Sequence, residues 1–364
     1  MDRAIKRLKI STPGRVCLFG EHQDYLFLPV IACAVSLRIS IEGERQNEAA
    51  VNLDLPDLGT KLSFPLSGTR EYKHDRDYYR SSLNVLFRHG FSFQGGFKCR
   101  VQGDIPINAG TSSSSALIVS WLSFLAWMSR QEINLPPDDL AGYGYQAEVL
   151  EFGEPGGMMD HHATAYGGII GIDFHPHIRV KKLRTDLKEF VIGDSGEPKD
   201  TKHVLAKVKN RVLGLVSELS VKHPDFSLLH ASSESIERFR KDLNAMEYEL
   251  LEGTVRNHSI THQARELLAE RSLDHRQFGS LLNDHQRVLR DVLRISTPKI
   301  DRMLEAASKA GAYGGKINGS GGGGCMFAYG PEKSEQIAEA IRGAGGKAYI
   351  VKADVGTKVD LIEG

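Results

Sequence analysis

The sequence predicts an α+β protein with two domains. The chain has 364 residues, which is long for one ordinary hydrophobic core and suits two. Strand-like and helix-like segments alternate in the first half, whereas helices dominate from residue 202 onward. The last part changes again, to strand, glycine-rich loop, strand, helix and strand, and this order is typical of a small α+β unit.

The expected elements of the first half follow from the spacing of apolar residues. Residues 7–18 and 30–42 show the apolar alternation of strands. The apolar run Ala116–Met128 is interrupted by serines and is too short to span a bilayer, so we expect a buried helix there. The other expected elements are strands at 49–66, 96–101 and 168–173 and helices at 77–89, 138–152 and after Asp160.

The second half is expected to be mainly helical before it ends in the small α+β unit. The segment at about 176–200 is basic and rich in turn residues, so we place the domain boundary there, which gives domains at 1–190 and 191–364. The expected helices are 202–219, 233–251, 259–268, 278–294 and 298–310, followed by strands at 315–318, 325–329 and 347–352 and a helix at 332–344.

Charge and cysteine content argue against several classes of protein. Lys+Arg and Asp+Glu are equal at 46 each, so no global basic field would hold nucleic acid or an anionic membrane. The four cysteines form no C-x-x-C pair, which suits a reducing cytoplasm better than a disulfide framework or a zinc site. The charged N-terminus lacks the apolar core of a signal peptide. We expect a cytoplasmic protein, monomeric or homodimeric, with a small-molecule partner.

A serine-rich loop precedes the apolar helix. It reads Asp104-Ile-Pro-Ile-Asn-Ala-Gly-Thr-Ser-Ser-Ser-Ser-Ala116, and exposed amides at a helix start favour an anion. Serine hydroxyls can add donors or ligate magnesium. The loop lacks the lysine of a Walker A motif and is not G-x-G-x-x-G. The alternative is a serine N-cap after a flexible turn, although four serines exceed the need of a cap.

Two further segments are rich in ionisable side chains. Near the N-terminus, Glu21 and Asp24 flank His22, and such groups are poor core residues but good acceptors for the hydroxyls of a sugar. A solvated, charged turn is the alternative. Farther along, Glu148 and Asp160 suggest magnesium, which prefers carboxylate and hydroxyl oxygens. Asp160 follows a glycine turn, where a helix cap is the alternative.

The triplet Asp160-His161-His162 raises two other possibilities. Three consecutive residues are not expected to ligate one metal, because neighbouring side chains on a helix diverge by about 100°. The triplet also matches the name motif of the DHH phosphoesterases, but the other aspartate-rich motifs of that family are not visible in the chain.

A glycine-rich loop, G-S-G-G-G-G-C at Gly319–Cys325, lies between two strand-like segments. Consecutive glycines allow close approach of the main chain and positive φ angles. The alternative is a disordered linker, but a linker would be expected in polar surroundings, and the flanking residues are apolar.

The order of these motifs resembles that of the GHMP kinase superfamily, which includes galactokinase, homoserine kinase, mevalonate kinase and phosphomevalonate kinase. Pro13–Tyr25 is similar to motif one in its galactokinase form, and Pro106–Ala116 is similar to motif two, the phosphate loop. Gly157–Asp160 resembles the segment that carries the catalytic aspartate, and Lys316–Cys325 resembles motif three. The sequence is therefore identified as a galactokinase-like member of this superfamily.

The resemblance implies a fold and an activity. The fold would combine an N-terminal ribosomal-S5-like α/β domain with a C-terminal ferredoxin-like domain that carries extra helices, and the active site would lie in the cleft between them. The activity would be ATP-dependent phosphorylation of a small sugar, with ATP and Mg²⁺ as cofactors. The acceptor would be the anomeric hydroxyl of galactose or of a related monosaccharide.

The resemblance also implies roles for individual residues. Asp160 would accept the substrate proton or orient the hydroxyl, and Arg15 would lie beside it and keep it ionised. Ser114 and Glu148 would ligate magnesium. The implied sugar contacts are Glu21, His22, Asp24 and Gly157, and the implied ATP contacts are Gly110, Thr111, Ser112, Ser113, Ser114, Ser115, Gly321 and Gly322.

Several positions depart from the galactokinase pattern. Cys17 and Gln23 stand where Asn and Thr are typical, Leu26–Pro29 replaces a turn that contains glycine, and Ser115 stands where alanine is common. The retained Glu-His-x-Asp-Tyr favours a hexose or related sugar over mevalonate, because polyhydroxylated ligands need paired acceptors. A mevalonate- or homoserine-type metabolite kinase and a non-catalytic galactokinase-like sugar sensor remain as alternatives.

Overall fold

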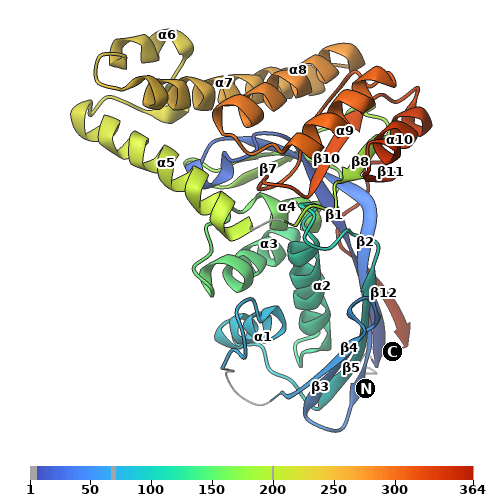
Figure 1. Ribbon diagram of the computed structural model, residues 1–364. Coiled ribbons are helices and arrows are strands. Elements are labelled where there is room, and N and C mark those ends of the chain that lie inside the picture. The colour runs from blue at the N-terminus through green and yellow to red at the C-terminus, as the bar shows by residue number, and fades with distance from the viewer. Residues whose placement is uncertain (1–5, 67–70, 199–200, 364) are drawn as a thin grey trace.

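The computed structural model describes residues 6–66, 71–198 and 201–363, so the first five residues of the charged N-terminus lie outside the described part. Within these ranges the chain forms an eight-stranded sheet and a four-stranded sheet, each flanked by helices (Figure 1). Among the helices of the described ranges, none combines the length and the apolar character that a membrane crossing requires.

The large sheet is built almost entirely from the first half of the chain. The long antiparallel pair β1 and β2 forms its centre, and the order along the sheet is β12-β1-β2-β5-β3-β4. β6 pairs with the first residues of β2, and β7 pairs with β6. The strands are β1 (Arg7–Phe19), β2 (Val30–Gln46), β3 (Ala50–Leu55), β4 (Thr60–Pro65), β5 (Gly96–Gly103), β6 (Ile169–Asp173) and β7 (Arg179–Lys182).

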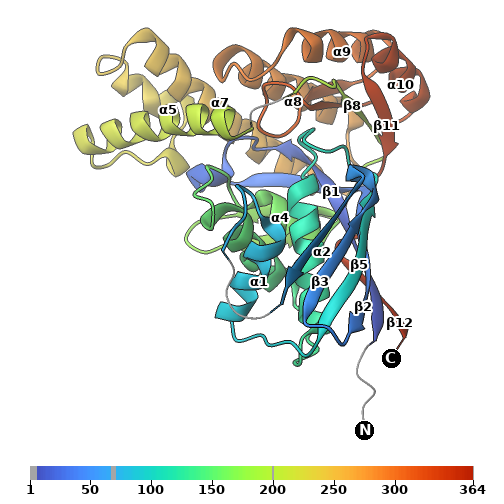
Figure 2. The same cartoon turned by 60° about the horizontal axis from the view of Figure 1, so that its bottom comes forward.

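The helices α1 (Tyr78–Arg88), α2 (Ser113–Met128) and α4 (Met159–Tyr166) lie on one face of this sheet (Figure 2), and α3 (Pro137–Tyr145) packs against α2 and α4 (Figure 1). The predicted buried helix is confirmed as α2. Its Trp121 and Phe124 are fully buried, with ring centroids 5.4 Å apart, and Phe124 also contacts Phe97 of β5 edge to face. This packing fixes α2, so the position of its N-terminal end is fixed as well.

The small sheet has the order β11-β8-β10-β9 and is antiparallel throughout. With α9 before β9 and α10 between β10 and β11, the chain follows a β-α-β-β-α-β path, which is the ferredoxin-like arrangement. The predicted ferredoxin-like unit is therefore confirmed. Its elements are β8 (Phe190–Asp194), α9 (Pro298–Lys309), β9 (Gly314–Ile317), β10 (Cys325–Tyr329), α10 (Ser334–Gly343) and β11 (Lys347–Val351).

The extra helices lie between β8 and α9, and here one prediction is wrong. The helices expected at 233–251 and 259–268 are instead a short α6 and a continuous α7. Asn244 caps α7 by accepting from two amides, and Glu247 completes a capping box, so a new helix begins after Asn244. The extra helices are α5 (Thr201–Lys222), α6 (Ser233–Ile236), α7 (Ala245–Leu268) and α8 (His275–Arg287).

Three strands, β7, β8 and β12, lie outside the expected elements. β8 lies inside the basic segment that was taken as the domain boundary. After β11 the chain leaves the small sheet, and β12 (Lys358–Glu363) pairs antiparallel with β1 of the large sheet. The pairing runs from Ser11 opposite Lys358 to Arg7 opposite Glu363. The described residues nearest the two ends of the chain, Arg7–Ser11 and Lys358–Glu363, therefore lie in the same sheet, while the division at residues 190 and 191 stays a prediction.

A shared apolar core joins the two sheets. Phe19 and Ile31, from the ends of β1 and β2, belong to the same buried cluster as Phe190, Phe278 and Phe327 of the C-terminal half. The rings of Phe19 and Phe278 meet edge to face at 5.5 Å. The loop that follows β1 is therefore held between the two halves of the molecule.

Candidate active site

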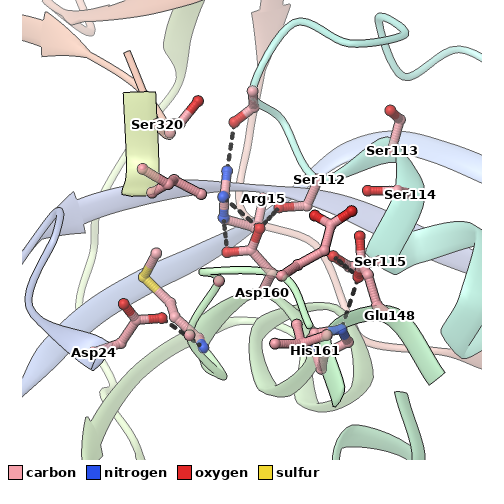
Figure 3. Close-up of a pocket in the computed structure, with 18 of the residues that line it drawn as sticks. Arg15, Asp24, Ser112, Ser113, Ser114, Ser115, Glu148, Asp160, His161 and Ser320 are labelled. Atoms are coloured by element: carbon pink, nitrogen blue, oxygen red, sulfur yellow. Dashed lines mark hydrogen bonds and ion pairs between the residues drawn. The ribbon is translucent and has the colours of Figure 1, made fainter. Parts of the chain in front are cut away.

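A pocket opens where the two halves meet (Figure 3). The loop after β1, the loop before α2 and the start of α4 form its wall, together with Leu205 of α5 and the loop between β9 and β10. The predicted site residues that the structure brings together in this wall are Arg15, Glu21, His22, Asp24, Gly110, Ser112, Ser113, Ser114, Ser115, Glu148, Gly157 and Asp160.

Three predicted ATP contacts lie behind the wall instead. Thr111 is fully buried, and its carbonyl accepts from the Arg15 amide at 3.1 Å. Gly321 packs against Ile295, and the amide of Gly322 donates to the Ile295 carbonyl at 2.7 Å. In the glycine-rich loop, Gly319 and Ser320 line the pocket.

Asp160 lies at the centre of the pocket and is held by Arg15. The Arg15 Nε donates to Oδ1 at 2.8 Å, and Nη2 donates to Oδ2 at 2.6 Å. Ser112 Oγ also donates to Oδ2 at 2.6 Å. Burial opposes ionisation, but the Arg15 charge and the Ser112 hydroxyl outweigh it and hold the pKa of Asp160 below its ordinary value. Asp160 is therefore ionised at neutral pH.

The serine-rich loop leads into α2 through a left-handed residue. Ser112 is the N-cap residue, with φ 59°, and its side chain makes no capping bond because it donates to Asp160 instead. The first amides of a helix have no acceptor within the helix. Because Ser112 leaves them uncapped, the amides at the start of α2, together with the hydroxyls of Ser113 and Ser114, are suited to bind an anion (Figure 3).

The two glycine-containing loops pack backbone against backbone. The Gly110 carbonyl accepts from Arg15 Nη1 at 2.5 Å and from Asn318 Nδ2 at 2.8 Å. A Cβ on Gly319, whose φ is +80°, would lie 2.9 Å from that same carbonyl oxygen. Glycine is therefore needed at 319 for close approach, and the glycine-rich loop supports the serine-rich loop from behind.

Glu148 lies on a π-helical turn, Gln146–Leu150, beside the start of α2. Its Oε2 accepts from Ser115 Oγ and contacts His161 Nε2, each at 2.7 Å. Burial opposes ionisation, but His161 and the hydroxyls of Ser114 and Ser115 lower the pKa of Glu148 below its ordinary value. An ionised carboxylate next to the Ser114 hydroxyl fits a hard cation such as Mg²⁺.

The structure also shows what each residue of the triplet Asp160-His161-His162 on α4 contacts. Asp160 faces Arg15, His161 faces Glu148, and the Nδ1 of His162 lies 2.9 Å from the Met158 carbonyl oxygen. Three consecutive side chains thus have three different partners, as the helical rotation requires. Within the described residues, no cluster of three or more His, Cys, Asp or Glu side chains is arranged to hold a metal by itself. A cation at Glu148 would accordingly need phosphate oxygens or water to complete its ligands.

Asp24 forms the other end of the pocket. Its carboxylate accepts from the amides of Tyr25 at 2.9 Å and Met159 at 3.2 Å. A Cβ on Gly157 would overlap this carboxylate, which explains why glycine is needed there. Burial and the neighbouring Asp160 charge raise the pKa of Asp24 to about 6. Unlike Asp160, Asp24 has no cationic partner among the described residues.

Glu21 is bound by a lysine from the opposite half of the molecule. Lys316 of β9 is 0% exposed, and its Nζ donates to Glu21 Oε2 at 2.8 Å and to the carbonyls of Cys17 and Ile317. His22 lies between the two halves in the same way. Its Nδ1 is 2.8 Å from the Tyr25 hydroxyl and its Nε2 is 3.1 Å from the Ser320 carbonyl.

Sequence reasoning gave no role to Lys316 or to the pair Arg76 and Glu154. Arg76 lines the pocket and makes a bidentate contact with Glu154, at 2.5 and 2.8 Å. Nothing in the sequence connects these two residues. Lys316 did give a signal, because a lysine within a buried strand requires a carboxylate or carbonyl partner.

Known protein families match three parts of the chain. The galactokinase galactose-binding signature matches residues 5–45, the GHMP kinases N terminal domain matches 77–168, and the GHMP kinases C terminal domain matches 264–347. The chain belongs to the GHMP kinase superfamily. As a GHMP kinase it is a phosphotransferase that uses ATP as the phosphate donor and acts on an alcohol group.

Curated relatives extend over nearly the whole GHMP kinase chain. A mevalonate kinase of Pyrococcus furiosus is 29% identical over 354 residues, which covers 94% of this chain and 95% of the relative. A galactokinase of the same organism is 26% identical over 351 residues, with 93% of each chain covered.

Solved structures confirm the predicted two-domain GHMP kinase fold. The galactokinase of Lactococcus lactis, solved with galactose, superposes with a TM-score of 0.85 at 20% identity and covers 98% of this chain and 95% of its own. The mevalonate kinase of Methanococcus jannaschii gives 0.73 at 22% identity and covers 95% of this chain and 98% of its own.

Proposed function

We propose that this GHMP kinase transfers the γ-phosphoryl group of ATP to the anomeric hydroxyl of galactose or of a related neutral monosaccharide. The observation that carries the proposal is the galactose-binding signature at residues 5–45. It contains Arg15 and the three polar side chains Glu21, His22 and Asp24, and the structure gathers all four in the pocket wall.

The charges at the substrate end support a neutral acceptor. Arg15 balances Asp160, and Lys316 balances Glu21, so Asp24 contributes a charge that no lysine or arginine of the described residues offsets. A sugar hydroxyl can donate to this carboxylate, whereas a carboxylate-bearing acceptor such as mevalonate would be repelled. The basic run at Arg179–Arg184, a possible partner for an acidic sugar, begins on β7 and does not line the pocket.

Asp160 is better suited to orient the sugar hydroxyl than to remove its proton early. A general base works best when its pKa is near the working pH, and the pKa of Asp160 is low. Phosphoryl transfer mainly requires positioning and charge stabilisation, so an ionised acceptor in a fixed place is sufficient until the new bond forms. Arg15, fixed by Asp160 and the Gly110 carbonyl, would face the transferred phosphoryl group.

Ser114 and Glu148 are the residues that would hold Mg²⁺, which would neutralise charge on the phosphates of ATP. The start of α2 would bind the same phosphates through its amides. These roles need no residue beyond those already gathered in the pocket wall, and Arg15, Ser114, Glu148 and Asp160 are all present. This complete set favours an enzyme over a non-catalytic sugar sensor.

A mevalonate-type kinase is the second candidate, because the relative at 29% identity bears that name. An ADP-release assay with ATP, Mg²⁺ and a panel of acceptors separates the candidates. Galactose or another neutral hexose is expected to release ADP, and Asp160→Asn serves as the control for contaminating kinases. Release with mevalonate or homoserine but with no sugar would overturn the sugar assignment.

A further inference from the structure

Two hydrogen-bonding side chains approach the same oxygen of the Glu148 carboxylate. Ser115 Oγ and His161 Nε2 both approach Oε2, each at 2.7 Å (Figure 3). Both side chains are almost completely buried, with exposed fractions of 2% and 1%. These contacts come from two helices, α2 and α4, so the carboxylate is fixed from two directions.

The His161 ring is dedicated to this contact. An ionised carboxylate can only accept, so the imidazole ring carries a proton on Nε2 and donates it to Glu148. Its Nδ1 is buried and has no hydrogen-bond partner among the described residues. Gly144 of α3 makes room for the ring, because a Cβ there would lie 2.9 Å from His161 Cδ2. The position of the ring is therefore set by packing and by Glu148 alone.

We propose that His161 and Ser115 are positioning residues that restrict Glu148 to a single metal-binding oxygen and so make the site prefer Mg²⁺ over Ca²⁺. This inference rests on the proposed function, in which Ser114 and Glu148 ligate the cation. With Oε2 occupied by two donors, only Oε1 can reach a cation. Mg²⁺ needs a compact octahedral set of ligands and is satisfied by one carboxylate oxygen, whereas Ca²⁺ takes six to eight oxygens and readily uses both.

Direct binding of metal–nucleotide complexes tests the inference without any sugar. The probe is the non-hydrolysable imido analogue of ATP, saturated with either Mg²⁺ or Ca²⁺, and calorimetry gives the ratio of the two dissociation constants. His161→Leu removes the donor, and we expect it to weaken the Mg²⁺ complex and to reduce the preference for Mg²⁺ by about tenfold. His161→Gln keeps an amide donor and should restore most of the preference.

Ser115→Ala provides an independent variant, with an expected reduction of about threefold for the loss of one hydrogen bond. It also decides the question if His161→Leu does not fold, which circular dichroism and thermal unfolding would reveal. An unchanged Mg²⁺ preference in Ser115→Ala and in a folded His161→Leu would overturn the inference. A purely structural role for the two residues predicts that same result, because stability would change and the metal ratio would not.

Two further variants separate failure of this inference from failure of the proposed function. Ser114→Ala and Glu148→Gln remove the proposed ligands themselves, and both should weaken the Mg²⁺ complex whatever holds Glu148 in place. If neither does so, the cation lies elsewhere and the proposed metal site fails together with the inference. If both weaken it while the His161 and Ser115 variants keep the wild-type ratio, only the positioning role is wrong.

Discussion

The two ends of the pocket are built in different ways. Most residues of the phosphate end, from Ser112 to His161, lie on helices and loops that cover the large sheet, and Arg15 joins them from β1. The substrate end uses the Glu21 loop, which is held by Asn257 and Lys316, 236 and 295 residues away in sequence. The groups for phosphoryl transfer therefore come from the half that contains the large sheet, whereas recognition of the acceptor depends on the junction between the halves. Related kinases can therefore retain the phosphoryl-transfer groups while the residues that recognise the acceptor change.

The largest expected loss of activity comes from a substitution at the phosphate end, and it should leave the junction between the two halves intact. Asp160→Asn is expected to keep the fold and ATP binding but to lower turnover about 10³-fold, because the fixed negative acceptor for the hydroxyl is lost. Steady-state kinetics and calorimetry with ATP would measure this. Near-normal turnover would reject the role of Asp160.

At the substrate end, breaking the buried ion pair should affect stability first. Lys316→Met leaves Glu21 buried without its partner, and we expect the free energy of unfolding to fall by about 3 kcal/mol, as measured by urea denaturation. Adding Glu21→Gln to Lys316→Met should recover part of the loss. Losses that simply add in the double variant would show that the pair does not couple the two halves.

A smaller effect is expected when a metal ligand is removed. Ser114→Ala should raise the Mg²⁺ concentration for half-maximal activity about tenfold and leave the KM for sugar unchanged, because Ser114 lies at the phosphate end. A rise in the sugar KM instead would mean that the two ends are not independent.

The smallest expected effect is the dependence of kcat/KM for the sugar on pH, through the ionisation of Asp24 at the substrate end. The pKa of Asp24 is raised to about 6, so the carboxylate becomes protonated as the pH falls through that value and stops accepting from the sugar. We expect kcat/KM for the sugar at pH 5.5 to be about fourfold below its plateau above pH 7. Asp24→Asn should flatten this acid limb in a pH profile, and an unchanged limb would assign it to another group.

The same contrast explains what the sequence could predict. Ser112–Ser115, Glu148 and Asp160 belong to short motifs whose chemistry depends on near neighbours, and the structure gathers them as expected. The directions of adjacent side chains were less predictable, because each step along a helix rotates them by about 100°. The hydrogen bond from the Ser115 hydroxyl to Glu148 was not foreseen, while the contact of Ser115 with ATP stays a prediction.

Long-range partners could not be predicted from the sequence. The partner of Lys316 is set by the pairing of distant strands, and no local pattern specifies it. β8 was hidden by the basic residues around it, and β12 is a short strand whose pairing and register depend on the distant β1. The helices at 233–251 and 259–268 were misjudged because apolar spacing was weighed above the cap signal of Asn244.

The return of β12 to the large sheet has a consequence for motion. The chain crosses between the sheets twice, at residues 183–189 and again at 352–357. Two covalent crossings tie both ends of the segment β8–β11 to the large sheet, so they restrict the relative motion of the two sheets more than a single crossing would. A cut within either crossing, with the other left intact, would release that constraint.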